Sequence, residues 1–470
     1  MSGETGTNDD RSRAADLGMP VIVAIFAVSA AVCCAVAAAG QAGLTDLHVY
    51  RMGGAAALHG TSLYGPRYHG LPFTYPPFAA AVFVVLTVLP WAAAATLLTA
   101  ASAAALPLML YLALRLPSAA AGGRQTAHRC PPVGSKPQID ALRAAGARPA
   151  AAWLSRRDAA RLALAAAALA IWLEPVRTTL NYGQVDLLLA AAVLYDLAVP
   201  DSARRKGVAT GLAAGLKLTP AIFVAYLLLT RRYRAAATAA AVCAATLGIG
   251  YAVLPASSAR YWGGMFLSPG HISPVSDPQN QSLQGALART LHTASPAHLW
   301  LPLAIVVALA GLMLAARAQR RGDEALGFAL CAVTGLLISP ISWTHHWVIA
   351  VPALLLAATA LYRDRTRSRR ARRLGLAAIA APAVIGWARM ARVVPGRHWL
   401  HLPALGILDS EIYVIAGLLA LTLAARPLLA RTVLAGTVLA KGAAGIPPGQ
   451  AAREPDADEV PQLATRRGTR

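Results

Sequence analysis

The sequence predicts an all-α, polytopic membrane protein, and two observations point to that fold class. Hydrophobic residues make up 57% of the 470 residues and charged residues only 14%, against roughly 25% charged residues in soluble domains. The mean hydropathy is +0.51. Because a membrane-spanning helix needs about 20 apolar residues, the apolar runs from residue 20 to about 430 predict a bundle of about 12 transmembrane helices in one integral domain.

The two ends of the chain differ from this apolar region. Residues 1–19 form a polar, slightly acidic segment that we expect to be a cytoplasmic leader. The run 20–40 is predicted to be a retained span, because a signal peptide has a basic start and a shorter apolar core. Residues 431–470 are rich in Pro, Gly and mixed charge, which predicts a disordered cytoplasmic tail.

The net charge of +22 raises the question of a nucleic-acid partner. The basic residues, however, form short clusters between apolar runs and lack a recognition module. Such clusters are typical of cytoplasmic anchors under the positive-inside rule, so the expected partner is the lipid bilayer and no nucleic acid. They lie at 204–206, 231–234, 317–321 and 363–373, and a flexible basic loop is predicted at about 117–157. The segments left for the outer face are 41–76, 174–184, 255–298, 340–345 and 393–410.

Two stretches leave the topology open. Hydropathy predicts two spans within 77–115, whereas the charge distribution requires an odd number there. The stretch 207–230 resembles a single span, yet basic clusters flank it on both sides. Either 207–230 is a broken pair that turns near Lys217–Pro220, or the loop 115–161 is external despite its charge.

Asp46 is the first candidate for chemistry, because it follows the first apolar run directly. The spacing of residues 46–59 predicts a short helix in the plane of the interface, within the first outer loop. Asp46 can cap that helix or act as a base, and both roles are compatible. Tyr50 and Arg51 on the same helix, and Tyr75 in the following loop, are further candidates for substrate binding.

Other polar residues interrupt the apolar runs. Lys217 lies where a charged group costs about 2.5 to 3.5 kcal/mol, so it either binds an anionic phosphate or snorkels to the interface. Amide side chains suit sugar hydroxyls, although a capped turn explains some of them equally well. The remaining substrate-binding candidates are Arg177, Asn181, Gln184, Gln279, Asn280 and Trp343.

His345 and His346 stand at the mouth of a span, where an interfacial belt residue is the common alternative. Neighbouring positions on a helix point about 100° apart, so we expect only one of the two to face a given cavity. Zinc needs three or four convergent ligands, and no HxxxH or HxxE spacing occurs here. The five cysteines form no CxxC pair. We therefore expect no metal and no cofactor.

Six motifs occur in an order that resembles glycosyltransferase family 87. They are Asp46–Arg51, Phe73–Phe78, Asn181–Asp186, Gly211–Pro220, Gln279–Ser282 and Ser339–Trp347, and the resemblance covers nearly all of 20–430. These actinobacterial enzymes include polyprenyl-phosphate-mannose-dependent alpha-(1->2)-mannosyltransferases. The resemblance implies a GT-C fold with its active site facing the cell exterior. It also implies that Asp46 is the catalytic aspartate and that His345 or His346 lines the same site.

The donor that this resemblance implies carries mannose or arabinofuranose on a polyprenyl phosphate. An α-linked product from a β-configured donor requires inversion, for which one base is enough. We expect Asp46 to be that base, and expect His345 or His346, Lys217, Arg51 or Arg177 to stabilise the leaving phosphate. The predicted function is a metal-independent mannosyltransferase of the plasma membrane with a glycolipid, lipoglycan or polysaccharide acceptor. The alternatives are an arabinofuranosyltransferase of the same fold and a non-catalytic lipid-linked-sugar transporter or scaffold.

Overall fold

The computed structural model describes residues 18–38, 43–117, 154–267, 274–294, 296–364, 366–390 and 410–426. One compact unit comprises Met1–Leu423, and a second comprises Ala424–Arg470, of which only 424–426 are described. The predicted leader, basic loop and tail therefore lie almost wholly outside the described residues, as does most of the predicted outer segment 393–410.

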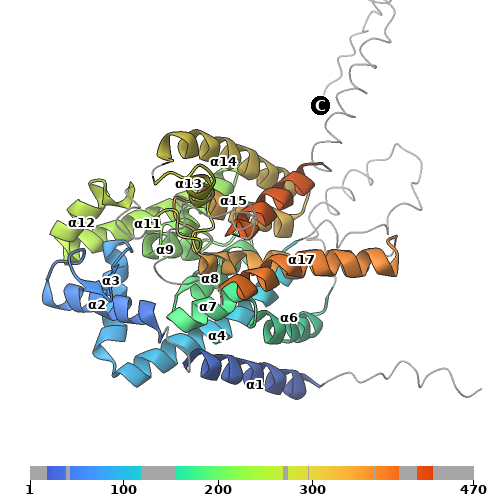
Figure 1. The fold of residues 1–470 in the computed structure, drawn as a ribbon, viewed down its shortest axis with the longest axis horizontal. Coiled ribbons are helices and arrows are strands. Elements are labelled where there is room, and N and C mark those ends of the chain that lie inside the picture. Colours follow the sequence, from blue (N-terminus) through green and yellow to red (C-terminus); the bar gives the residue numbers. More distant parts are fainter. Residues whose placement is uncertain are drawn as a thin grey trace, which may run out of the picture. The chain divides into compact units, whose positions relative to one another are not determined.

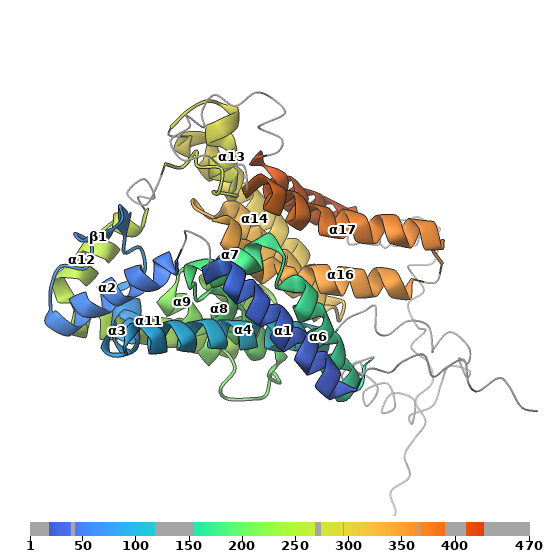
Figure 2. The same cartoon turned by 60° about the horizontal axis from the view of Figure 1, so that its bottom comes forward.

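The described chain is helical apart from one small hairpin (Figures 1 and 2). Strands β1 (Arg67–Tyr68) and β2 (Leu71–Pro72) pair antiparallel between the second and third helices. The α-helices are α1 (Met19–Ala38), α2 (Thr45–His59), α3 (Pro77–Val88), α4 (Trp91–Arg115), α6 (Arg156–Ala170), α7 (Glu174–Tyr182), α8 (Asp186–Ala198), α9 (Val208–Leu216), α10 (Ile222–Leu229), α11 (Tyr233–Val253), α12 (Pro255–Trp262), α13 (Leu283–Thr290), α14 (Ala297–Arg320), α15 (Glu324–Ile338), α16 (Val351–Arg363) and α17 (Arg369–Met390). Short 3-10 helices are η2 (Thr219–Ala221), η3 (Met265–Leu267) and η5 (Thr344–Ala350).

Five helical segments among the described residues are long and apolar enough to cross a membrane, or six if the bent pair α6–α7 is one span. The five are Met19–Val36, Trp91–Arg115, Tyr233–Val253, Ala297–Arg320 and Thr344–Arg363. This makes the chain a multi-pass membrane protein, although the count stays below the predicted 12. Part of the difference arises because other apolar runs form shorter helices, namely Pro77–Val88, Thr219–Leu229, Glu324–Ile338 and Ile412–Arg426.

The stretch 77–115 contains only one helix of spanning length. Its apolar run is divided at Leu89, which has an extended backbone, and at Pro90, which is the N-cap of α4. Helix α3 has 12 residues and α4 has 25, and only α4 reaches the length that a bilayer requires. One span within 77–115 agrees with the odd number that the charge distribution requires there.

The stretch 207–230 is broken, as the first of the two alternatives proposed. Helix α9 ends at Lys217, whose backbone is extended, and the chain continues through η2 into α10. Helices α9 and α10 contact one another. The ends of α9 and α10 that lie away from Lys217 also come together. Arg232, which follows α10, lies 3.3 Å from Asp201, which precedes α9. The chain therefore enters and leaves this stretch at the same end of the bundle.

An ion-pair network joins the segments predicted to lie inside. Lys206 Nζ is 2.9 Å from Asp201, and Arg232 donates to both carboxylate oxygens of Glu324. Tyr226 donates to the same Glu324 at 2.9 Å. Three of the polar connections of the chain, the α8–α9, α10–α11 and α14–α15 links, thus meet at one place.

Candidate active site

Asp46 lies in the first turn of α2, a helix that contacts α7. The helix confirms the one predicted at 46–59, but its N-cap is Leu44, so the capping role expected for Asp46 is wrong. The chain starts the helix earlier because the backbone N–H of Leu44 donates to the carbonyl of Asn181 at 3.0 Å. Asp46 Oδ2 accepts a hydrogen bond from Gln184 Nε2 at 2.5 Å.

The environment of Asp46 shifts its acidity. The pKa of this carboxyl is raised to about 7, mainly by burial and in smaller part by the nearby Asp186 charge. The hydrogen bond from Gln184 and the positive charge of Lys217 oppose the shift. A carboxylate with a pKa near neutrality is well matched to general base catalysis.

Gln184 connects Asp46 to two buried tyrosines. Its Oε1 accepts from the Tyr50 hydroxyl at 2.6 Å and from the Tyr75 hydroxyl at 2.9 Å. Gly183 places Gln184 there: its φ of 68° ends α7, and a Cβ at this position would lie 3.2 Å from Leu47 Cβ. Glycine adopts this left-handed conformation without strain, so α7 can end directly against α2.

Lys217 and Asp186 form a buried ion pair in the site. Lys217 Nζ lies 2.6 Å from Asp186 Oδ1, and it stands over the Tyr75 ring at 5.4 Å from the centroid. Lys217 is 8% exposed, which excludes the snorkelling alternative within this unit. Its cost of burial is offset by the aspartate that begins α8.

His345 and His346 lie in η5 and both approach Asp186. One ligand atom from each of these three residues lies within 4.8 Å of the others. The two rings are perpendicular with centroids 4.7 Å apart. The expectation that only one histidine faces the site was therefore wrong. It assumed an α-helical segment and considered only the Cβ directions, whereas the segment is a 3-10 helix and each imidazole extends well beyond its Cβ.

Several polar atoms of this cluster are buried without a hydrogen-bond partner in the described chain. They are both ring nitrogens of His345, Nδ1 of His346 and Oδ2 of Asp186. Buried polar atoms are normally hydrogen-bonded, so these atoms are available to a ligand. Three N and O ligands suit a metal ion, but Lys217 is already paired with Asp186 and neutralises the one carboxylate that would attract a divalent cation. Histidine N–H groups and Lys217 together suit an anion better.

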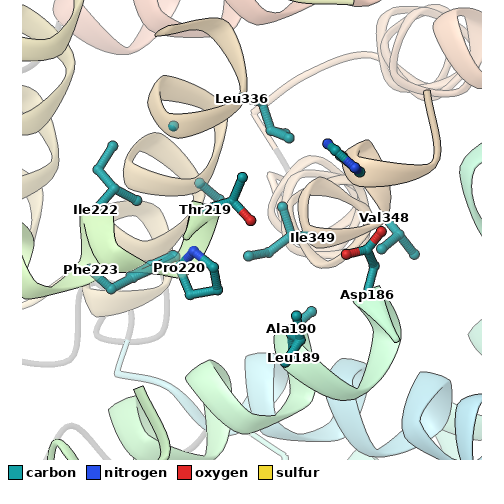
Figure 3. Close-up of a pocket in the computed structure, with 13 residues that line it drawn as sticks. Asp186, Leu189, Ala190, Thr219, Pro220, Ile222, Phe223, Leu336, Val348 and Ile349 are labelled. Atoms are coloured by element: carbon teal, nitrogen blue, oxygen red, sulfur yellow. The ribbon is translucent and has the colours of Figure 1, made fainter. Parts of the chain in front are cut away.

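The pocket in Figure 3 adjoins this cluster. Its volume is about 40 Å³, and His346 and Asp186 belong to its wall. The Asp186 carboxylate extends from α8 into a largely apolar surround that includes Ile349 and Phe223 (Figure 3). The low polarity of this wall strengthens the electrostatic interactions of Asp186.

A larger apolar cavity of about 730 Å³ lies between α4, α15, α16, α17 and the helix Ile412–Arg426. Figure 2 shows α16 and α17 side by side. Trp347, which follows His346 directly, forms part of the cavity wall, and Arg363 at the other end of α16 also lines it. The cavity therefore extends from beside the histidine pair along the length of α16.

Two of the predicted binding residues are used within the fold. Arg51 donates to the carbonyls of Leu86 and Leu89 at 2.5 and 2.8 Å, where α3 ends. Asn280 is fully buried and bonds only to backbone groups, donating to Val275 and Pro340. Within the described residues, neither side chain hydrogen-bonds to Asp46 or Gln184.

The remaining predicted residues lie on α7 and in two loops. Arg177 and Asn181 lie on α7, and Asn181 Oδ1 is buried without a hydrogen-bond partner in the described chain. Gln279 hydrogen-bonds to Tyr182, and Trp343 pairs through its backbone with Asn280. Sequence reasoning missed Asp186, although a carboxylate opening an apolar run, like Lys217 within one, needs a partner.

Comparisons with known proteins identify the family of this chain. The model of Glycosyltransferase family 87 matches residues 73–340. A Mycobacterium tuberculosis protein named polyprenol-phosphate-mannose-dependent alpha-(1-2)-phosphatidylinositol pentamannoside mannosyltransferase is 33% identical over 81% of this chain and 78% of its own. A Mycolicibacterium smegmatis protein, named in the same way but for phosphatidylinositol mannoside, is 33% identical over 68% and 71%.

The crystal structure of ArnT from Cupriavidus metallidurans bound to undecaprenyl phosphate aligns with 92% of this chain and 82% of its own, at 18% identity and a TM-score of 0.42. The family assignment comes from the sequence comparisons alone, since the matched family covers more than half of the chain and the curated relatives span most of it. The chain belongs to glycosyltransferase family 87 and is a glycosyltransferase.

Proposed function

We propose that this protein transfers mannose from a polyprenyl phosphate to a phosphatidylinositol mannoside on the outer face of the plasma membrane, within a GT-C-type bundle. Support for donor and sugar comes from the names of the relatives, which share 33% identity with this chain. The relatives differ in the acceptor that they are named for, which is a phosphatidylinositol pentamannoside in one and a phosphatidylinositol mannoside in the other. The distribution of basic clusters supports the outer orientation.

The observation that carries the mechanism is a partly buried carboxylate, Asp46, with a pKa of about 7. Its charge interacts with Lys217 and with Asp186, and Asp186 lies next to the buried, unbonded histidines. Asp46 accepts the proton of the acceptor hydroxyl while that oxygen attacks the anomeric carbon. The bond from the anomeric carbon to the phosphate oxygen breaks, and its electron pair leaves with the polyprenyl phosphate. One base and one displacement give inversion at the anomeric carbon.

Negative charge develops on the departing phosphate, and the groups around Asp186 can stabilise it. Lys217 supplies a fixed positive charge, and His345 and His346 supply N–H donors. Such donors act strongly in a low-dielectric site. The proposed reaction needs no metal ion for this step.

The apolar cavity beside Trp347 supports a lipid-borne donor. Its wall is formed almost entirely by apolar side chains, so an isoprenoid chain can pass from the bilayer into the cavity without exposing its apolar surface to water. A phosphate held at the histidine pair would place the start of that chain next to the cavity.

Transfer of radiolabelled mannose from polyprenyl phosphate to phosphatidylinositol mannosides, in purified protein reconstituted into vesicles, tests the proposal. Asp46→Asn is expected to lower kcat by roughly 10²- to 10⁴-fold, because the amide cannot accept the proton. Asp364→Asn is the matched control, since this carboxylate lies at the far end of α16 and bonds only to its own loop. Dialysis against a chelator should leave turnover unchanged.

The same assay separates the alternatives. Near-normal turnover of a correctly inserted Asp46→Asn protein would exclude Asp46 as the base. Transfer from polyprenyl-phosphate arabinofuranose but not from the mannose donor would reassign the sugar. Movement of labelled lipid without a new glycosidic bond would indicate a transporter.

A further inference from the structure

Tyr50, Tyr75 and Gln184 form a closed triangle of oxygen atoms behind Asp46. The two hydroxyls lie 2.9 Å apart, and they lie 2.6 and 2.9 Å from Gln184 Oε1. Each hydroxyl carries one proton, so only two of the three contacts can be hydrogen bonds at one time. Burial raises the pKa values of Tyr50 and Tyr75 well above their usual range, which keeps both protons in place.

This triangle fixes the orientation of the Gln184 amide. Its carbonyl oxygen faces the hydroxyl protons, and its Nε2 faces Asp46 Oδ2 at 2.5 Å. The opposite orientation would bring two acceptor atoms together, because an ionised carboxylate only accepts hydrogen bonds. Both ends of the amide therefore favour the same orientation, and the choice follows from the hydrogen-bond network.

The result for Asp46 is an asymmetric carboxylate. Oδ2 is held by Gln184, whereas Oδ1 has no hydrogen-bond partner in the described chain. We infer that Gln184, held by Tyr50 and Tyr75, is the positioning residue of the base and presents Asp46 Oδ1 to the acceptor hydroxyl. This inference rests on the proposed function of Asp46. It gives Tyr50, Tyr75 and Gln184 a role behind the base, in place of the substrate contacts expected from sequence.

Gln184 also influences when Asp46 is ionised. The amide donates only to the carboxylate and so favours its charged form. The other ionisable groups that act on Asp46 or face it are Lys217, Asp186, Tyr50, Tyr75 and Tyr182. Because the base works only when ionised, kcat/KM of the wild-type protein should rise with pH to a plateau, with a midpoint of about 7.

Gln184→Met tests the inference, because methionine has a similar length and no amide. Loss of a hydrogen bond to a charged group should move the midpoint upward by about 1 to 2 pH units. At pH 7 this corresponds to a loss of roughly 5- to 50-fold in kcat/KM, whereas KM should stay close to the wild-type value. The matched control is Gln281→Met, another fully buried glutamine, which bonds to Pro278 and Ser410. Its midpoint should not move.

The tyrosines supply a second test that does not depend on Gln184→Met folding. Tyr50→Phe and Tyr75→Phe each leave one donor on Gln184 Oε1, so each should have a small effect alone. The double variant frees the amide and should approach the behaviour of Gln184→Met, which is a non-additive pattern. Tyrosines that contact substrate directly would instead raise KM additively.

The outcomes distinguish this inference from the proposed function. Turnover in Asp46→Asn would overturn the base itself. If Asp46→Asn is inactive, an unshifted pH midpoint in Gln184→Met would overturn the positioning role alone. Additive KM effects of the two tyrosine variants would do the same.

Discussion

At the scale of single residues, substitutions of Lys217 and Asp186 can distinguish an effect on stability from an effect on catalysis. Both are buried, and Lys217 Nζ lies 2.6 Å from Asp186 Oδ1. Breaking a buried ion pair from one side costs about 3 to 5 kcal/mol, because the remaining charge stays buried and unpaired. Replacing both partners by apolar residues is often close to neutral.

We therefore expect Lys217→Met to lower the free energy of unfolding by about 3 to 5 kcal/mol, and Lys217→Met/Asp186→Leu to recover most of it. Activity should remain low in the double variant, because the positive charge next to the phosphate is missing. Thermal unfolding in detergent and mannose transfer measure the two effects. Recovery of both stability and activity would show that Lys217 serves only the fold.

The sequence singled out Asp46, Lys217 and the histidine pair as candidate site residues, because each is a polar group where the chain is otherwise apolar. It did not identify what each one bonds to. Asp46 and Gln184 are 138 positions apart, and the bond between them depends on how α7 ends against α2. Such a contact belongs to the tertiary packing and has no local sequence signature.

At the scale of elements, Gly183 determines how closely α7 approaches α2. Gly60 at the end of α2 is a natural control, because both glycines have a left-handed backbone, with φ of 68° and 64°. A Cβ at Gly183 would lie 3.2 and 3.3 Å from atoms of Leu47 and Leu44, whereas a Cβ at Gly60 would meet nothing within 4 Å. An alanine at either position would therefore have the same backbone strain, but only at Gly183 would its Cβ also crowd α2.

Gly183→Ala and Gly60→Ala should each lose about 1 to 2 kcal/mol of stability from the left-handed backbone. Only Gly183→Ala should also move Gln184 away from Asp46, and displacement of this kind can lower kcat by up to about 100-fold. Comparing melting temperature with kcat for the two variants measures the difference. Equal kcat values would mean that the α2–α7 contact tolerates the methyl group.

Element boundaries were predictable where the apolar spacing was regular, as for α2. They were not predictable where one apolar run contains a break, as at Lys217 between α9 and α10. Hydropathy averages over a window of about 19 residues, so two helices of nine and eight residues resemble one span. The basic clusters on both sides were the better signal.

At the scale of the whole molecule, charge and contacts agree on which connections lie together. Asp201, Lys206, Arg232 and Glu324 come from three different links between helices and form one network. Such a network requires these links to lie on one side of the membrane. In the proposed orientation this side is cytoplasmic, as the positive-inside rule favours, and we expect the hairpin β1–β2 after α2 on the exterior.

Single cysteines in a variant lacking the five native ones test this arrangement. Ser62, beside the hairpin, and Ser202 are exposed serines, and Tyr233 begins α11 at 63% exposure. Ser62→Cys should react with a membrane-impermeant maleimide in intact cells, whereas Ser202→Cys and Tyr233→Cys should react only after permeabilisation. If α9 and α10 together formed one span, Ser202→Cys and Tyr233→Cys would react from opposite sides. Reaction of both from the same side requires the chain to turn back near Lys217, where its ammonium group meets Asp186.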